Sequence, residues 1–175
     1  LYFYGIDTFS DIFLNDKLII STNNMFHPWE KDVSKYLHSG LNELKVIFHS
    51  PIKKVFPLMD KIKHSLPAEN DQAGKTSPFS RKAPYHYGWD WGPCLVTSGI
   101  WKNVQLHGWD SFTLNKCSIL NGGVEKKCAT LFLEVEVFSI KKESATISIE
   151  ESKSNTSLQI PIEIEKGKNV IDKKL

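Results

Sequence analysis

The sequence predicts an all-β chain. Apolar and polar residues alternate with a period of two through nearly every patterned stretch, which is typical of half-buried strands. No helical pattern extends beyond about two turns, and Glu30 to Leu37 is the best candidate for a single turn. With 175 residues, the chain allows one ordinary domain or two small ones. It is too short for a (β/α)₈ barrel, which needs roughly 200–250 residues or more.

The first part of the chain, residues 1–110, is rich in aromatic residues and holds all five tryptophans. Alternation predicts a strand over residues 43–48, whose inward-facing residues are Leu44, Val46 and Phe48. It predicts another strand from Ile100 to Leu106, in which Val104 and Leu106 face inward. Residues 65–80 are polar and rich in turn-forming residues, so we expect a long exposed loop there.

The second part, residues 111–175, contains neither tryptophan nor histidine. Strict alternation predicts strands over residues 131–138, 145–150 and 158–165. The expected turns are Asn121–Gly123, Lys141–Glu143, Ser152–Asn155 and Lys166–Asn169. Short strands at roughly ten-residue spacing predict an immunoglobulin-like β-sandwich. The pattern stops after about five strands, so we expect this sandwich to be C-terminally truncated.

Composition and motifs argue against several classes of function. The formal charge is only +2 and the lysines are scattered in short pairs, so we predict no nucleic-acid partner. No apolar run approaches the roughly 18 residues of a membrane span, so we predict no membrane partner. The chain has no glycine-rich phosphate loop and no nucleophile or metal-binding motif, and its six histidines are dispersed. We therefore predict no metal and no cofactor.

The start of the chain and its cysteines allow two further expectations. The opening Leu1 to Gly5 is typical of the inside of a strand, so we expect a fragment of a longer protein. The three cysteines are too few, and odd in number, for a disulfide-rich scaffold. Cys117 and Cys128 flank Asn121–Gly123 almost symmetrically and could face each other across a hairpin. We favour two unpaired thiols.

The most unusual segment is Arg81 to Pro93, in which Asp90 stands between two tryptophans. In an extended segment Trp89 and Trp91 would share one face, and Asp90 would point the other way. Indole faces stack on sugar C–H groups and a carboxylate accepts hydrogen bonds from hydroxyls, so these residues have the chemistry of a sugar subsite. The alternative is a small aromatic core in which Asp90 caps a turn, and the residues alone leave both interpretations open.

Three blocks of the sequence together resemble a known family. The first block is Leu1–Asn15, which includes Gly5-Ile6-Asp7-Thr8 and Leu14-Asn15. The second is Asn24-Met25-Phe26, followed by Asp32-Val33 and Leu41–Pro51. The third comprises Arg81-Lys82, Gly88-Trp89-Asp90-Trp91-Gly92-Pro93 and Gly99–Val104. These blocks resemble the N-terminal part of the β-mannosidases of glycoside hydrolase family 2, and the third block is highly specific for that branch.

The resemblance implies a fold and an activity. Residues 1–110 would form a galactose-binding-like jelly-roll β-sandwich, N-terminally truncated because its first strands are missing, and residues 111–175 would begin the immunoglobulin-like domain. A (β/α)₈ barrel would follow, with two glutamates that remove terminal non-reducing β-D-mannose residues with retention. Because that barrel is absent, no catalytic residue is assigned to this chain, and we expect the chain alone to be inactive. The implied partners are β-mannosides, manno-oligosaccharides or N-glycan-derived, and the barrel of the same polypeptide.

The resemblance also implies roles for individual residues. Trp89 would wall the −1 subsite, and Asp90 would bind the mannose hydroxyls remote from the anomeric carbon. Trp91 would pack inward, because neighbours in an extended loop point opposite ways. Arg81 and Lys82 would position the loop, with Arg81 as a candidate to pair with a carboxylate. Asn24-Met25-Phe26 would form a turn with a core anchor.

Alternative functions remain open at this point. One is a β-galactosidase or β-glucuronidase of the same family, although the tryptophan–aspartate–tryptophan block argues against it. Another is a stand-alone, non-catalytic carbohydrate-binding module, because jelly rolls serve both roles. A third is a purely structural spacer. The compartment also stays open: we favour the periplasm, the exterior or the cytoplasm of a bacterium, and an animal protein would be lysosomal.

Overall fold

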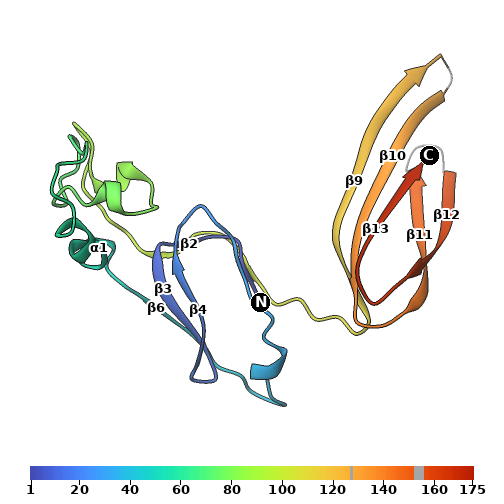
Figure 1. Cartoon of the computed structure of the whole chain (residues 1–175), viewed down its shortest axis with the longest axis horizontal. Coiled ribbons are helices and arrows are strands. Elements are labelled where there is room, and N and C mark those ends of the chain that lie inside the picture. The colour runs from blue at the N-terminus through green and yellow to red at the C-terminus, as the bar shows by residue number, and fades with distance from the viewer. Residues whose placement is uncertain (127, 152–155) are drawn as a thin grey trace. The chain divides into compact units, whose positions relative to one another are not determined.

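Strands make up most of the regular structure, as the alternating pattern predicts. The computed structural model describes residues 1–126, 128–151 and 156–175. These residues divide by their contacts into two units, Leu1–His107 and Gly108–Leu175 (Figure 1). No helix among the described residues is long and apolar enough to span a membrane.

Short antiparallel strands form the first unit. They are β1 (Tyr2–Phe3), β2 (Ile6–Asp7), β3 (Phe9–Leu14), β4 (Lys17–Asn23), β5 (Trp29–Glu30), β6 (Leu44–Phe48), β7 (Gly99–Ile100) and β8 (Val104–Gln105). They pair in three sheets with the orders β5-β1-β8, β2-β7 and β4-β3-β6. The strands β1 and β2 therefore pair with β8 and β7, which brings the first and third sequence blocks side by side.

The β3–β4 hairpin explains the Leu-Asn pair that ends the first block. Asn15 and Asp16 form its two-residue loop, with φ values of 48° and 60°, the left-handed conformation that a type I′ turn requires. The Asn15 side chain donates to the carbonyl oxygen of Tyr36 at 2.9 Å and accepts from the backbone N–H of Glu43 at 2.9 Å. One asparagine thus shapes the hairpin and fixes it to the segment that leads into β6.

The core of the first unit lies among β1 to β4 and the segment before β6. Its buried residues are Phe3, Ile6, Ile12, Leu14, Ile19, Ile20 and Val33. Val46 and Phe48 pack against this core as the alternation predicts, whereas Leu44, expected on the same face, is exposed.

The strand predicted from Ile100 to Leu106 is broken in the structure. Only the two-residue strands β7 and β8 form in this stretch. Val104 and Leu106, which were expected to face inward, are both exposed within the described residues. Both strands are held by backbone pairing with β1 and β2, so alternation of the side chains does not decide their burial.

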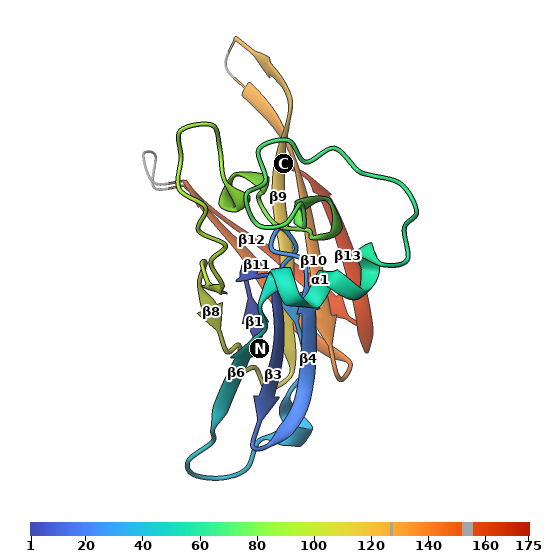
Figure 2. The ribbon, with the colours of Figure 1, turned by 90° about the vertical axis from the view of Figure 1, so that its left-hand side faces the viewer.

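One α-helix, α1 (Pro51–Met59), was not predicted within this mostly β structure. Ser50 caps it, since its side chain accepts a hydrogen bond from the backbone N–H of Lys53 at 3.3 Å, and Pro51 occupies the first turn, where its missing N–H costs nothing. Val55 is buried, and Pro57 lies within the helix. Figure 2 shows α1 and the long, largely irregular connection that follows it.

Three short 3₁₀ helices complete the first unit. They are η1 (Ser34–Tyr36), η2 (Ser77–Phe79) and η3 (Pro84–Tyr87). The first lies inside Glu30 to Leu37, where a single turn was expected. The second ends the polar connection of residues 65–80, and the third leads directly into the tryptophan–aspartate–tryptophan segment.

The second unit contains longer strands with two facing sets of apolar residues. They are β9 (Phe112–Glu125), β10 (Cys128–Ser139), β11 (Glu143–Glu151), β12 (Thr156–Ile164) and β13 (Gly167–Lys174). Their sheet orders are β13-β10-β9 and β11-β12. The core consists of Leu133, Val135, Val137 and Ile164, with Ala145, Ile147, Ile149, Ile160 and Ile162 packed against it. Strands therefore form in all three stretches where alternation predicted them, and one apolar set of each faces this core, while Leu158 is exposed.

One predicted turn of this unit is wrong. Asn121–Gly123 lies inside β9, and the pairing of Thr130 with Gly123 but Leu131 with Asn121 leaves one extra residue, a β-bulge. Cys117 pairs with Val135 rather than facing Cys128. Both thiols are free, as favoured above. The turn predicted at Ser152–Asn155 lies outside the described residues.

Candidate functional site

The tryptophan–aspartate–tryptophan segment forms a tight turn rather than an extended strand. Trp89 and Gly92 pair as an isolated antiparallel bridge, and the Gly92 N–H donates to the Trp89 carbonyl oxygen at 3.3 Å. Asp90 and Trp91 occupy the two central positions of this turn. The indole rings of Trp89 and Trp91 meet edge to face, with centroids 6.4 Å apart and an interplanar angle of 88°.

The turn exposes all three side chains of the motif. Trp91 is 85% exposed and Trp89 is 46% exposed, so the expectation that Trp91 packs inward is wrong for this chain. The central residues of a two-residue turn both project outward, which removes the alternation assumed for an extended loop. Asp90 is exposed as well, and no residue in the described part of the chain donates a hydrogen bond to its carboxylate or pairs with its charge.

A separate segment supports the turn from behind. Gly88 has a φ of 117°, and a Cβ at this position would lie 2.9 Å from the Asn70 carbonyl oxygen, so a side chain does not fit. The Gln72 side chain donates to the Trp89 carbonyl oxygen at 3.1 Å. The backbone N–H of Gln72 donates to the carbonyl oxygen of Tyr87 at 2.7 Å. The turn is therefore fixed by its backbone, which leaves its side chains free to contact a ligand.

A buried ion pair lies beneath this region. The Lys82 ammonium donates to the Asp7 carboxylate and to the Thr97 carbonyl oxygen, the latter at 2.8 Å. The side chains of Lys82 and Asp7 are 0% and 6% exposed, and the Thr8 hydroxyl donates to the second carboxylate oxygen. Arg81 was the candidate to pair with a carboxylate, but in the structure it is Lys82 that pairs with one, that of Asp7. Arg81 is exposed and forms no ion pair within the described residues.

Burial and charge shift the proton affinities around this pair. Desolvation lowers the pKa of Lys82, while the hydrogen bond and the charge of Asp7 oppose that fall. The Nδ1 atom of His86 lies 3.7 Å from the Asp7 carboxylate and 3.5 Å from the Thr97 hydroxyl. Desolvation, and then the charge of Lys82, lower the pKa of His86 against the effect of Asp7. Because the pKa of His86 is lowered, we expect a neutral His86 at neutral pH.

Met25 joins the second sequence block to the third. It is buried, as expected for a core anchor. Its N–H donates to the Arg81 carbonyl oxygen at 3.0 Å, and its sulfur accepts from the Ala83 N–H at 3.0 Å. The Trp101 indole donates to the Met25 carbonyl oxygen at 3.2 Å, and this ring lies directly against Gly5. The three blocks therefore meet at one place in the fold.

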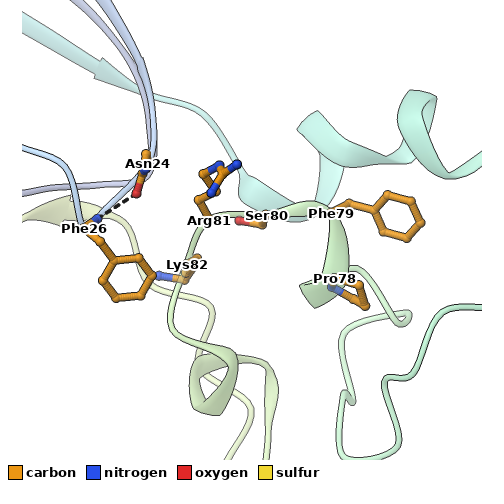
Figure 3. Close-up of a pocket in the computed structure, with 7 residues that line it drawn as sticks. All are labelled: Asn24, Phe26, Pro78, Phe79, Ser80, Arg81 and Lys82. Carbon is orange, nitrogen blue, oxygen red and sulfur yellow. Dashed lines mark hydrogen bonds between the residues drawn. The ribbon is translucent and has the colours of Figure 1, made fainter.

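An open depression of about 640 Å³ lies on the outer side of the Arg81 segment (Figure 3). Its lining residues are Asn24, Phe26, Pro78, Phe79, Ser80, Arg81 and Lys82. The turn residues Trp89 and Asp90 do not line it. No Asp or Glu side chain of the described residues lines it either. Among the described residues, no group of three or more His, Cys, Asp or Glu side chains is placed to hold a metal ion.

Sequence reasoning missed part of the polar cluster beneath the turn. Asp7, His86 and Thr97 were not singled out as supporting residues. The signal for Asp7 was present, because an acidic residue within an apolar strand needs a partner when it is buried. No local pattern indicated His86 or Thr97, since their relation to Asp7 depends on how the strands β2 and β7 pair.

The geometry and the sequence of the first unit agree on its class. Residues 1–102 match the family model described as glycosyl hydrolase 2 galactose-binding domain-like, so this unit is an antiparallel β domain of the galactose-binding-like class. That match covers more than half of the chain. The chain therefore belongs to the glycosyl hydrolase 2 family, and the resemblance of the three blocks to its β-mannosidases is confirmed.

Several relatives are β-mannosidases. The chain is 38% identical over 108 residues to β-mannosidase B of Aspergillus flavus, a match that covers 61% of this chain and 13% of the relative. It is 32% identical over 142 residues to β-mannosidase B of Aspergillus niger, covering 80% and 17% respectively. The crystal structure of β-D-mannosidase from Dictyoglomus thermophilum superposes with a TM-score of 0.82 at 33% identity, covering 99% of this chain and 21% of that one. The chain spans less than a quarter of the length of these relatives.

Proposed function

We propose that this chain forms the accessory β domains of a longer β-mannosidase that hydrolyses terminal non-reducing β-D-mannose residues with retention. In this proposal residues 1–110 are a jelly-roll domain that supplies part of the −1 subsite, and residues 111–175 belong to an immunoglobulin-like domain. The observation that carries the proposal is the exposed Trp89–Gly92 turn, whose carboxylate has no partner among the described residues. The named β-mannosidases similar to this chain supply the substrate class.

The turn has the chemistry that recognition of a sugar requires. The face of Trp89 offers an apolar surface for the C–H groups of a pyranose ring. The Asp90 carboxylate accepts hydrogen bonds from the hydroxyls remote from the anomeric carbon, and such charge-assisted bonds are about twice as strong as neutral ones. Trp91 meets Trp89 edge to face and so limits the tilt of its ring. The backbone of Arg81 bonds to Met25 and the side chain of Lys82 pairs with Asp7, so both residues attach the segment before this turn to the core.

Hydrolysis itself requires groups that we place outside this chain. Retention needs two carboxyl groups about 5–5.5 Å apart on either side of the scissile bond. Strand glutamates of the second unit are engaged in surface ion pairs, Glu134 with Lys116 at 2.5 Å and Glu136 with Lys168 at 2.7 Å. We therefore expect the 175-residue chain to release no nitrophenol from nitrophenyl β-mannoside.

The test is a kinetic comparison in the longer protein that carries this chain. Initial rates are measured with nitrophenyl β-mannoside, β-galactoside and β-glucuronide for the wild type, for Asp90→Ala and for the control Asp60→Ala, which removes another exposed carboxylate of the same unit. We expect preference for the mannoside and a loss in kcat/KM of about 100-fold for Asp90→Ala only, which corresponds to about 2.7 kcal/mol.

Each other result contradicts a stated part of the proposal. Preference for the mannoside without a loss in Asp90→Ala would remove Asp90 from the subsite. Preference for the galactoside or the glucuronide would move the protein to another branch of the family. Finally, we expect the 175-residue chain to bind free mannose with a Kd on the order of millimolar or weaker, because little of the sugar would be enclosed. Tighter binding would favour a carbohydrate-binding module.

A further inference from the structure

The polar side chains beneath the turn close the base of the loop that displays it. The loop spans residues 87–96, and its two stems are His86 and Thr97. The Nδ1 atom of His86 lies 3.5 Å from the Thr97 hydroxyl, and both stems converge on the Asp7–Lys82 pair. We call Asp7, Lys82, His86 and Thr97 the basal cluster.

Asp7 has a central position in the basal cluster. Its carboxylate accepts from Lys82 and from Thr8 and lies 3.7 Å from the Nδ1 atom of His86. Its backbone pairs with Gly99, two residues beyond Thr97, in the β2–β7 sheet. The side chain of Asp7 therefore lies next to the stem at His86, and its backbone pairs with the strand that follows the stem at Thr97.

We infer that Asp7 is a positioning residue, which holds the loop base closed and so fixes where Trp89 and Asp90 are displayed. The expected effect of Asp7 on catalysis rests on the proposed function. The claim that Asp7 holds the loop base closed does not depend on that function. The side chains of Trp91 and Asp90 are exposed, so the turn is held by the hydrogen bonds that Gln72 makes with its backbone and by its two stems. The stems connect the loop to the sheet in which Asp7 pairs with Gly99, and a displacement of about 1 Å at a binding group can cost a factor on the order of 100 in rate.

The structural part is tested by hydrogen exchange on the protein itself. In Asp7→Asn, which keeps the shape but removes the charge, we expect the protected amides of Gly92 and Thr97 to exchange about tenfold faster or more. The amides of the β3–β4 hairpin should keep their wild-type rates. The matched control is Asp16→Asn, which breaks the exposed Asp16–Lys45 pair and should leave the loop unchanged. Unchanged exchange at Gly92 and Thr97 in Asp7→Asn would overturn the inference.

A second variant separates position from stability. Asp7→Asn leaves Lys82 as an uncompensated buried charge, so a general loss of folding could mimic a loosened loop. The double variant Asp7→Asn/Lys82→Met removes both charges. We expect it to unfold at a denaturant concentration close to the wild type while its loop amides still exchange rapidly. If the loop amides of the double variant are protected as in the wild type and its stability is also restored, the basal cluster only stabilises the fold and does not position the loop.

The catalytic part is tested by a mutant cycle in the longer protein. Asp7→Asn should lower kcat/KM for nitrophenyl β-mannoside by about tenfold or more in the wild type. In the Trp89→Ala/Asp90→Ala background, the same change should have less than a twofold effect, because the groups that Asp7 positions are gone. Equal losses in both backgrounds would overturn the positioning role. If Trp89→Ala/Asp90→Ala is itself fully active, the proposed role of this turn in the subsite fails, and hydrogen exchange tests the structural part of the inference separately.

Discussion

Gly5→Ala is expected to be strongly destabilising, although it adds one methyl group to an ordinary backbone position. A Cβ at Gly5 would lie 2.5 Å from the Nε1 atom of Trp101 and 2.7 Å from its Cε2 atom. The indole must therefore move, and its hydrogen bond to the Met25 carbonyl oxygen is lost. Overpacking of this kind costs about 1–3 kcal/mol, and the lost bond adds about 1 kcal/mol. We expect the free energy of unfolding to fall by about 2–4 kcal/mol.

The assay is urea unfolding followed by tryptophan fluorescence, which reports on the first unit because four of the five tryptophans lie there. Gly99→Ala is the matched control, since a Cβ at that position meets no atom within 4 Å. It should change the free energy of unfolding by no more than about 0.5 kcal/mol. Equal unfolding midpoints for Gly5→Ala and Gly99→Ala would refute the reasoning, because they would mean that the indole does not need the space above Gly5.

Two further substitutions test the second core and one hydrogen-bonded carboxylate of the first unit. Ile164→Ala should cost about 2–5 kcal/mol because Ile164 is fully buried, while Leu158→Ala on the same strand should cost less than about 1 kcal/mol, as measured by urea unfolding with circular dichroism. Hydrogen bonds from Ser21 and His49 lower the pKa of Asp11, so its carboxylate contributes stability above the usual pKa of about 4 that is lost as the pH falls. The free energy of unfolding of Asp11→Asn should therefore be about 0.5–1 kcal/mol lower than that of the wild type at pH 7. This difference between the two proteins should disappear as the pH falls from 4 to the lowered pKa of Asp11. A difference that stays constant with pH would contradict the prediction.

Alternation predicted β10, β11 and β12 well because each of these strands has one face against the same core. Val135 and Val137 are buried on β10, and Ile147 and Ile160 face the same cluster. A shift of one residue would turn every side chain to the other face, so burial and sequence pattern must agree. The same rule failed between Ile100 and Leu106, where strands of two residues are held by backbone pairing alone.

The helix α1 was missed although its start was encoded. Ser50 followed by Pro51 is a strong signal for the first turn of a helix, because the hydroxyl caps and the proline needs no donor. Pro57 obscured the pattern, since an internal proline normally ends a helix. The nine residues of α1 are too few for its periodicity to outweigh that signal.

The location of the candidate site was predictable, but its geometry was not. The third sequence block pointed to Trp89, Asp90 and Trp91 from composition and resemblance alone. The alternative in which Asp90 lies in a turn was the one nearer to the observed backbone, and Gly92 supports it because glycine is favoured at the last position of a turn. The assumption of an extended segment placed Trp91 inside, and the turn places it outside.

The buried pair of Asp7 and Lys82 is better explained by position than by stability. Burying two charges is costly, and apolar replacements of both partners are often as stable as the pair they replace. The lowered pKa of Lys82 is consistent with that cost. An apolar contact would allow the segments that carry Asp7 and Lys82, 75 residues apart in sequence, to shift relative to each other, because apolar contacts are not directional. The directional, charge-assisted bond from Lys82 to the Asp7 carboxylate fixes one register of these segments. For this reason we expect Asp7→Asn/Lys82→Met to keep its stability and lose its ordered turn.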